Sequence, residues 1–330
     1  LAQASANVEV LVVDDGSTDR SVEVVQDLRT EGARLRLIHN PSNLGSGPTR
    51  NTAIARAKGQ YVMFVDSDDE LLEGALQAIT SRIEGSRLDI LVIGAVEHKR
   101  GHDYPLNDPD AIARLSKKSR SWKITDQPEL LMFTPSPWSK VFGLDFLRRH
   151  SIEFPSGYHQ DLPWSLEALL RAEHIGALNY VCYRYIRRGE GSSATRSKGT
   201  KTLVRVDQIK RIRERTDISS LPRNVQEHLV GSVAMHLIWG NRAAYRTLPE
   251  DLHEELFQRS STELKWWLEV ARPGPTVRSE PLMPTSEREK FTRSLEGGDF
   301  TSWQRAMAGH ARGLRWKRRF NPSRYRLFKA

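Results

Sequence analysis

Apolar and polar positions in the first hundred residues alternate between short β-branched runs and segments with helical spacing. Strands are predicted at VEVLVV, LRLIH, YVMFV and DILVIGAV, which start at residues 8, 35, 61 and 89. Helices are predicted between them, and this alternation is typical of a Rossmann-like, mostly parallel sheet with helices on both faces. Because YVMFV is apolar on both of its faces, we expect it to be a central strand.

The pattern changes in the second half of the chain. After Val96 it loosens, then resumes with TPSPWSKVFGLDFLRRH, a helix near residues 162–172 and a strand near residues 178–185. Beyond Lys198 it is mainly helical, and GEGSSATRSKGTK, rich in glycine, serine and charge, marks the boundary. We therefore expect an α/β domain over residues 1–198 and a helical C-terminal region over residues 199–330.

Composition narrows the class of protein. The chain has 330 residues, 38% of them hydrophobic, and a single cysteine, Cys182, which excludes an internal disulfide framework and favours a reducing compartment. No apolar run approaches the roughly 20 residues of a membrane span, and the opening LAQASANVEV lacks the features of a secretory signal. We therefore expect a cytoplasmic protein.

Positive charge gathers at the C-terminal end. The formal net charge is +9, and the final segment ARGLRWKRRFNPSRYRLFKA interleaves lysines and arginines with aromatic residues. Such a segment favours peripheral contact with an anionic membrane face or a polyanionic acceptor. It has no recognisable nucleic-acid recognition fold, so no nucleic acid partner is expected.

Two acidic motifs follow predicted strands. Asp14 and Asp15 leave the first strand, and Asp66, Asp68 and Asp69 leave YVMFV. Ligands of open α/β sheets bind at the carboxyl ends of the strands, so we expect these carboxylates at one rim. Their repulsion favours a bound cation, and the spacing of Asp66 and Asp68 suits Mg²⁺ or Mn²⁺. The chain lacks GxxxxGK[ST] and GxGxxG, which leaves phosphate binding to the metal.

Each acidic motif also has an interpretation that needs no ligand. Asp68 or Asp69 can cap a helix that begins near Leu71, and Asp15 with Gly16 can simply form a turn. Because the acidic pattern recurs at two equivalent strand ends, the ligand-binding interpretation is favoured.

Four segments together carry a family resemblance. In order along the chain, VVDDGSTD, NLGSGPTRN, AKGQYVMFVDSDD and PWSKVFGLDFLRRHSIEF resemble the inverting family 2 glycosyltransferases of the GT-A fold. The resemblance implies transfer of a sugar from a nucleoside diphosphate donor, usually a uridine one. It further implies that Asp14 and Asp15 contact the base and ribose of the donor, and that Arg50 faces the donor site.

The same resemblance implies a metal site and a base. Asp66, Ser67 and Asp68 correspond to the DxD motif, whose two carboxylates bind Mn²⁺ or Mg²⁺ and the diphosphate. In YHQDLPW, Asp161 matches the base that deprotonates the acceptor hydroxyl, although Gln160 stands where the family commonly has Glu. The alternative for Asp161 is a plain helix cap ahead of a proline.

A later segment, YRYIRRGEGSSATR, is similar to the part of the family that closes over the diphosphate, which makes Arg187, Arg188 and Ser193 candidate donor contacts. Family members also have a strand ahead of the DDGS motif that this chain does not contain, so we expect an N-terminally truncated domain. The expected acceptor is a polysaccharide, teichoic-acid-like polymer or lipid-linked sugar at the cell surface. The alternative function is a non-catalytic module that binds an anionic polymer or membrane.

Overall fold

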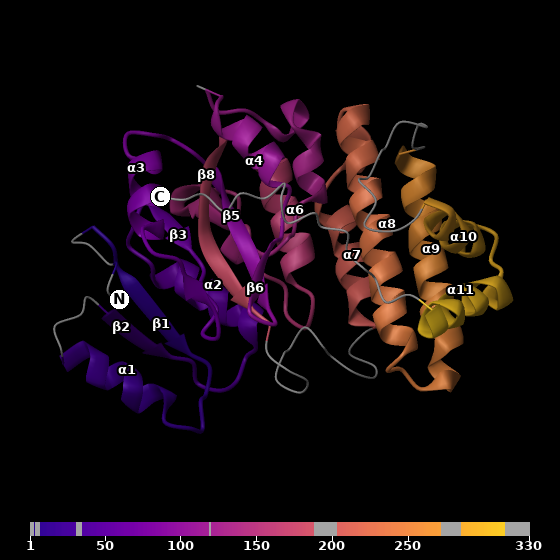
Figure 1. The fold of residues 1–330 in the computed structure, drawn as a ribbon, viewed down its shortest axis with the longest axis horizontal. Coiled ribbons are helices and arrows are strands. Elements are labelled where there is room, and N and C mark those ends of the chain that lie inside the picture. The colour runs from indigo at the N-terminus through magenta and orange to yellow at the C-terminus, as the bar shows by residue number, and fades with distance from the viewer. Residues whose placement is uncertain are drawn as a thin grey trace.

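A sheet-bearing part and a stack of helices lie side by side in this protein (Figure 1). The computed structural model describes residue 3 and residues 7–30, 35–118, 120–187, 203–271 and 285–313. Its strands are β1 (Val10–Asp14), β2 (Leu35–His39), β3 (Tyr61–Met63), β4 (Glu70–Leu71), β5 (Ile90–Lys99), β6 (His102–Pro105), β7 (Lys140–Gly143) and β8 (Ile175–Ile186).

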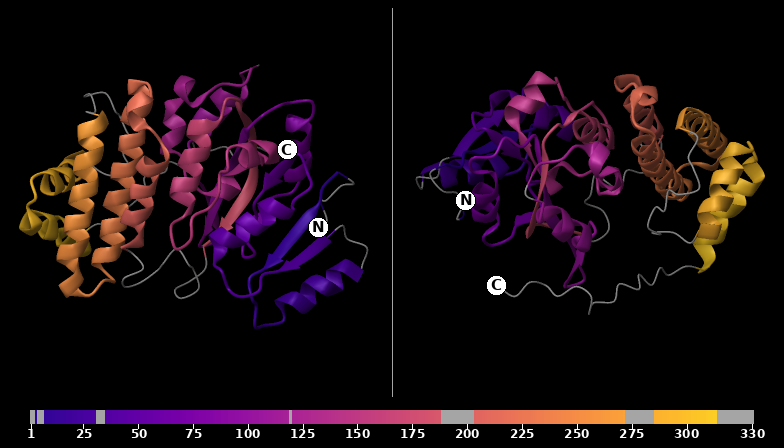
Figure 2. Two further views of the ribbon diagram at one scale, coloured as in Figure 1. Left: turned by 180° about the vertical axis from the view of Figure 1, so that it is seen from behind. Right: turned by 90° about the horizontal axis from the view of Figure 1, so that it is seen from above.

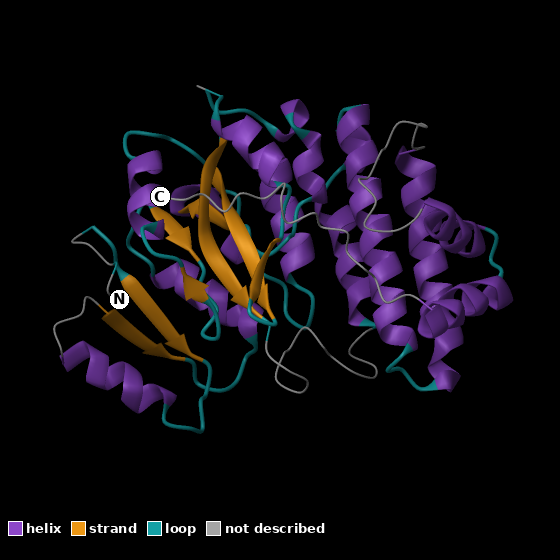
Figure 3. Ribbon diagram, in the orientation of Figure 1, coloured by secondary structure: helices purple, strands orange, loops and turns teal. Residues whose placement is uncertain are grey.

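Helices account for most of the remaining described chain. Figure 3 shows them around the strands and, without strands, in the C-terminal half. They are α1 (Ser21–Thr30), α2 (Ser46–Arg56), α3 (Ala75–Ile83), α4 (Pro109–Ser116), α5 (Leu144–Arg149), α6 (Asp161–Arg171), α7 (Val204–Arg215), α8 (Arg223–Tyr245), α9 (His253–Ala271), α10 (Thr285–Glu296) and α11 (Phe300–Gly313).

The strands form two sheets. β1 and β2 pair in parallel, in a register that runs from Val10 opposite Leu35 to Asp14 opposite His39. The other sheet has the order β3-β7-β5-β8-β4, and β6 also pairs with the C-terminal end of β5, from Val96 to Lys99. Within it only β5 and β8 pair in parallel, and its other described pairs are antiparallel. The α/β class is thus confirmed, but the sheet is mixed where we expected it to be mostly parallel.

The predicted central position of YVMFV is wrong. β3 pairs only with β7 among the described strands and lies at one end of the sheet order. Its strand pairing stops at Met63, and Val65 is 47% exposed. The apolar residues of this segment did not indicate a central strand. Phe64 lies beyond the paired part of β3 and packs in an aromatic group with Phe154 and Trp164.

Both faces of the larger sheet are covered. Alternate residues of β5 point to opposite faces, as the strand geometry requires. Leu91 and Ile93 pack in one apolar cluster with Ala75 and Ile79 of α3. Ile90 and Val92 belong to another cluster, which includes the buried side of α6. The predicted helices on both faces of the sheet are therefore confirmed.

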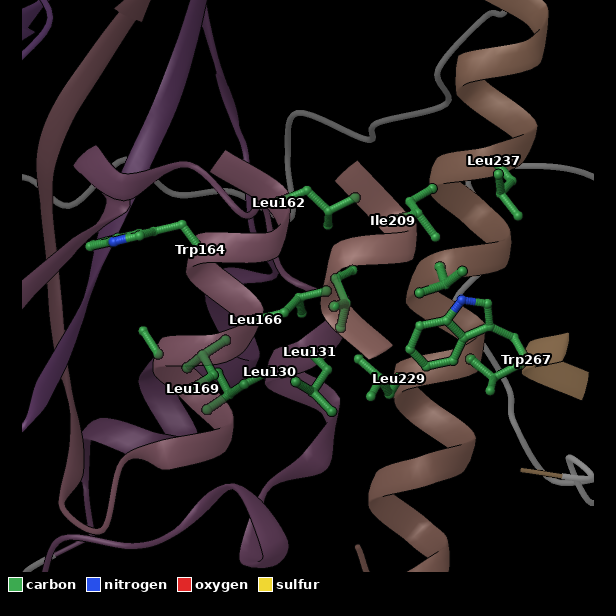
Figure 4. Packing of buried hydrophobic residues seen from close by; sticks show 14 of the residues in the cluster. Leu130, Leu131, Leu162, Trp164, Leu166, Leu169, Ile209, Leu229, Leu237 and Trp267 are labelled. Atoms are coloured by element: carbon green, nitrogen blue, oxygen red, sulfur yellow. The ribbon is translucent and has the colours of Figure 1, made fainter. Parts of the chain in front are cut away.

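The core that contains α6 continues into the C-terminal helices. Leu162 and Leu166 of α6 belong to the same buried cluster as Ile209 of α7, Leu229 of α8 and Trp267 of α9 (Figure 4). Seen from above, α7 to α11 stand beside the sheet part as further layers (Figure 2). The expected domain boundary at residue 198 lies outside the described residues. Among those that are described, no helix is both long and apolar enough to cross a membrane.

Candidate active site

Arg50 of α2 joins two carboxylates that are far apart in the sequence. Its Nη1 donates to Asp161 Oδ1 at 2.9 Å and its Nη2 donates to Asp66 Oδ1 at 2.7 Å. The Arg50 side chain is only 12% exposed, and its guanidinium lies 5.4 Å from the ring centroid of Phe154. A planar guanidinium suits this double role because its donors point in fixed directions. The structure therefore brings together three of the predicted site residues.

The local sequence explains why α2 presents Arg50 at this place. Gly45 precedes the helix with φ of 84°, a conformation that glycine adopts without strain. At Gly47 a Cβ would lie 2.6 Å from the carbonyl oxygen of Pro155, so only glycine allows this close approach. One turn later, the Asn51 side chain donates to the Phe154 carbonyl and accepts from the Phe154 N–H, at 2.9 and 2.8 Å. These contacts fix α2 against the segment that leads to Asp161.

Asp161 is the first residue of α6, and its carboxylate does not cap the helix. Gln160 occupies the N-cap position without a side-chain capping bond and instead donates to Ser46 Oγ. Although the Asp161 side chain is 36% exposed, desolvation by the surrounding protein raises its pKa, while Arg50 acts in the opposite direction. The plain helix-cap interpretation of Asp161 is therefore wrong, because Gln160 holds the N-cap position and the Asp161 carboxylate bonds to Arg50.

The turn after β3 holds the remaining carboxylates in different ways. Ser67 is exposed, and Asp68 makes no hydrogen bond or ion pair with the residues that the structure describes. Asp69 turns inward instead, where it accepts from the Tyr183 hydroxyl at 2.7 Å and from the Ile186 N–H at 2.8 Å. Burial raises the pKa of Asp69, and the Asp66 and Asp68 charges add to this effect.

The capping interpretation of Asp68 and Asp69 is corrected by the position of α3. This helix begins at Ala75, after Gly74 in the left-handed conformation, and the predicted start near Leu71 is instead the short strand β4. Neither aspartate is therefore at a helix N-terminus.

Asp66 and Asp68 fit a hard divalent cation with few protein ligands. Asp66 uses only one of its oxygens for Arg50, and Asp68 has both oxygens free of hydrogen bonds within the described residues. In the part of the chain that is described, no group of three or more His, Cys, Asp or Glu side chains is arranged to hold a metal. Mg²⁺ is commonly held by one or two carboxylates together with substrate phosphates and water. Asp66 and Asp68 can supply two carboxylates of this kind.

The carboxylates of the first acidic motif, Asp14 and Asp15, accept hydrogen bonds mainly from nearby loop and strand residues. Asp15 accepts from the Asn40 side chain at 2.8 Å and from the backbone N–H groups of Leu44 and Gly45 at 2.9 and 2.8 Å. Asp14 accepts from the Ser17 N–H at 3.1 Å and lies 3.4 Å from a ring nitrogen of His39. Hydrogen bonds to these carboxylates lower the pKa of both. Their predicted contact with a nucleoside stays a prediction.

The predicted contacts near the end of β8 have different outcomes. Arg187 donates from Nη1 to Glu97 Oε1 on β5 at 2.9 Å, so it is held at the end of the sheet. Arg188 and Ser193 lie outside the described residues. Whether any of these residues contacts a diphosphate stays a prediction.

Sequence reasoning missed three residues near the site. Tyr183 is fully buried and contacts the turn after β3, Trp138 stacks on it, and Lys140 is buried with its Nζ donating to Thr134 O, Ser136 O and Ser139 Oγ. Desolvation lowers the pKa of Lys140 to about 7, and Asp161 partly opposes this. All three lie in segments that carry the family resemblance, Trp138 and Lys140 in PWSKVFGLDFLRRHSIEF and Tyr183 in YRYIRRGEGSSATR, but nothing in these segments marked them for a role of their own. Aromatic residues in strands are ordinary core residues.

Comparisons with known proteins find similar glycosyltransferases. Residues 1–138 match the family model described as glycosyl transferase family 2. The uncharacterized glycosyltransferase EpsJ of Bacillus subtilis is 27% identical over 190 residues, a match that covers 56% of this chain and 54% of EpsJ. The poly(ribitol-phosphate) beta-N-acetylglucosaminyltransferase TarS of Staphylococcus aureus is 29% identical over 186 residues, covering 56% of this chain and 30% of TarS.

A solved structure extends the likeness to most of the chain. The crystal structure of S. aureus TarS 1-349 in complex with UDP-GlcNAc superposes with a TM-score of 0.69 at 19% identity. The superposition covers 94% of this chain and 84% of that one. The ordered motifs, the matched family model and the shared fold lead to one conclusion: residues 1–138 match glycosyltransferase family 2, and the chain has the GT-A fold.

Proposed function

We propose that this protein transfers a sugar, with inversion, from a uridine diphosphate donor to a hydroxyl of a cell-surface polymer. The observation that carries the proposal is the Arg50 bridge, which holds a candidate metal carboxylate, Asp66, and a candidate base, Asp161, on one guanidinium. Inverting transfer needs donor phosphates and a base on opposite sides of one sugar carbon. The residues that bind the donor phosphates and the residue that acts as base must therefore lie in the same site.

Asp66 and Asp68 would hold Mn²⁺ or Mg²⁺. When bound, the cation would neutralise the charge that develops on the leaving diphosphate. Arg50 holds one carboxylate oxygen of Asp66 in place. Among the described residues, the further candidate donor contacts are Asp14, Asp15, Ser67 and Arg187, and the sequence adds Arg188 and Ser193. A uridine donor is supported by the TarS complex, whose bound molecule is UDP-GlcNAc.

Asp161 acts as the general base in this proposal. Its raised pKa makes the carboxylate a better proton acceptor than an ordinary aspartate, and Arg50 opposes this shift by favouring the ionised form. The acceptor hydroxyl gives its proton to Asp161 while its oxygen attacks the sugar, and the bond to the diphosphate breaks in the same displacement. No covalent intermediate with the protein is required.

The acceptor class rests on the named relatives. TarS is a poly(ribitol-phosphate) glycosyltransferase, which supports a polymer with repeated hydroxyl groups and phosphates as acceptor. The basic segment after residue 313 would favour such a polyanion or an anionic membrane face, and it lies outside the described residues.

The Asp161→Asn substitution tests the proposal. Asparagine keeps the shape and can hydrogen-bond with Arg50, but it cannot accept the proton of the acceptor. Release of UDP from a panel of UDP-sugars, with Mn²⁺ and poly(ribitol phosphate), should fall by on the order of 10²–10⁴. Donor and Mn²⁺ binding, measured by calorimetry, should stay near the parental values.

Asp108→Asn is the matched control, because Asp108 caps α4 through the Asp110 N–H and lies outside the site. Asparagine caps about as well as aspartate, so this variant should keep its turnover. Near-parental turnover in Asp161→Asn would remove Asp161 from the role of base.

A further inference from the structure

The turn that carries Asp66 and Asp68 rests on a buried tyrosine from a strand more than a hundred residues away. The Asp66 N–H donates to the Tyr183 hydroxyl oxygen at 3.1 Å, and that hydroxyl donates to Asp69 Oδ2 at 2.7 Å. Tyr183 thus contacts the turn at both ends. The turn is closed further by the Asp69 N–H, which donates to the Asp66 carbonyl at 3.1 Å.

Asp69 also ties this turn to the end of β8. Its Oδ1 accepts from the Ile186 N–H at 2.8 Å, while its Oδ2 accepts from Tyr183. Both oxygens of Asp69 therefore face protein donors. This use leaves Asp66 and Asp68 as the carboxylates of the turn that are available to a cation.

The ring of Tyr183 is itself held rigidly. Trp138 stacks on Tyr183 with a centroid distance of 4.6 Å and on Tyr185 with a distance of 5.7 Å, and the planes differ by 5° and 8°. Tyr183 is 0% exposed and Trp138 is 6% exposed. The segment around Trp138 is anchored in turn by the three hydrogen bonds of the buried Lys140. The hydroxyl of Tyr183 is therefore in a fixed position beneath the turn.

We propose that Tyr183 is a positioning residue for the metal carboxylates: its hydroxyl, held by the Trp138 stack, fixes the turn so that Asp66 and Asp68 face the cation and the donor diphosphate. The part of this proposal that concerns metal rests on the proposed function. The part that concerns the turn rests only on the contacts of Tyr183. Outer partners of metal ligands typically change metal affinity by about 10- to 100-fold, and we expect an effect of this size.

The experiment compares Tyr183→Phe with Tyr185→Phe. Each variant loses one hydroxyl from the same aromatic stack, but the Tyr185 hydroxyl makes no hydrogen bond with the residues that the structure describes. The first readout is amide hydrogen exchange of the metal-free protein over residues 64–70. We expect faster exchange in Tyr183→Phe, because the Asp66 N–H loses its acceptor, and parental exchange in Tyr185→Phe.

The second readout is calorimetric binding of Mn²⁺ in the presence of UDP. Tyr183→Phe should weaken apparent Mn²⁺ affinity by about 10- to 100-fold, and Tyr185→Phe should leave it unchanged. Equal exchange and equal Mn²⁺ affinity in both variants would overturn the proposal. Equal weakening in both would also overturn it, because the stack and not the hydroxyl would then be responsible.

One outcome separates this proposal from the proposed function. If the parent protein binds neither Mn²⁺ nor UDP, the proposed function fails, while the exchange experiment still decides whether Tyr183 holds the turn.

If Tyr183→Phe does not fold, Asp69→Asn replaces it. An amide oxygen can still accept from Ile186, but the amide nitrogen cannot accept the tyrosine proton. Faster exchange over residues 64–70 in Asp69→Asn supports the proposal, and parental exchange overturns it.

Discussion

The two acidic motifs of this chain look alike in sequence but are held very differently. Asp14 and Asp15 at the end of β1 bond to groups between Ser17 and Gly45, which belong to the same β1–α2 unit. The turn after β3 bonds across the molecule, since Arg50 joins Asp66 to Asp161 and Tyr183 lies beneath the turn.

This difference separates a motif that stabilises its own loop from one that connects distant parts of the chain at the candidate site. Asp15 has hydrogen bonds to both of its oxygens, so removing it should first affect the loop before α2. Asp66 uses one of its oxygens for Arg50, bonds through the other to no described residue, and shares this arginine with the candidate base. Four predictions test whether the two motifs can be separated in this way.

The largest expected effect is at Asp66. Asp66→Ala removes a proposed direct metal ligand, and because outer partners alone change metal affinity by about 10- to 100-fold, we expect more than about 100-fold weaker Mn²⁺-dependent UDP binding. Calorimetry with UDP and Mn²⁺ measures the loss, and circular dichroism checks that the variant is folded. Binding equal to the parent would mean that the turn after β3 is not the metal site.

The next effect concerns pH and the Arg50 bridge. The base must be ionised, so kcat/KM should rise with pH through the pKa of Asp161, which lies above its ordinary value. Because Arg50 lowers that pKa, Arg50→Gln should move the acid limb of the pH profile to higher pH at saturating Mn²⁺. Arg148→Gln is a control, since Arg148 donates to backbone carbonyls at the end of α2. If the acid limb does not move in Arg50→Gln, the ionisation of Asp161 does not set the pH profile.

The same raised pKa has a consequence for stability. Between the unfolded and the folded pKa of Asp161, the folded state binds more protons, so the free energy of unfolding falls as pH rises through this window. The Asp161→Asn substitution removes this loss of stability, because asparagine does not ionise. The melting temperature of Asp161→Asn at neutral pH should therefore not fall below that of the parent.

The smallest expected effect is at Asp15. Asp15→Ala removes an acceptor from three hydrogen bonds at a half-buried position, which should lower the free energy of unfolding by about 1–3 kcal/mol. Urea denaturation measures this change, and Glu73→Ala on the exposed surface serves as the control. If Asp15→Ala keeps its stability but loses UDP affinity, Asp15 contacts the nucleoside as the sequence resemblance implies.

Local features of the fold were predictable from the sequence. β2 has the predicted bounds, and α6 begins one residue before its predicted start. Errors arose where pairing decides the outcome: β3 lies at a sheet edge, and α3 starts at Ala75 because Glu70 and Leu71 pair with β8. Local apolar periodicity carries no information about which strand a segment will pair with.

The amino-acid order by itself determined the chemistry that is available: carboxylates at the ends of two strands, an arginine on the helix after a glycine-rich loop, and an aspartate at a helix start. Only the tertiary structure decided which of these groups act together. Arg50 and Asp161 are separated by 111 residues and Asp66 and Tyr183 by 117, yet each pair is within hydrogen-bonding distance. The physical reason is that hydrogen bonds depend on distances of about 3 Å in space. Those distances exist only after the mixed sheet, α2 and α6 have packed on a common core.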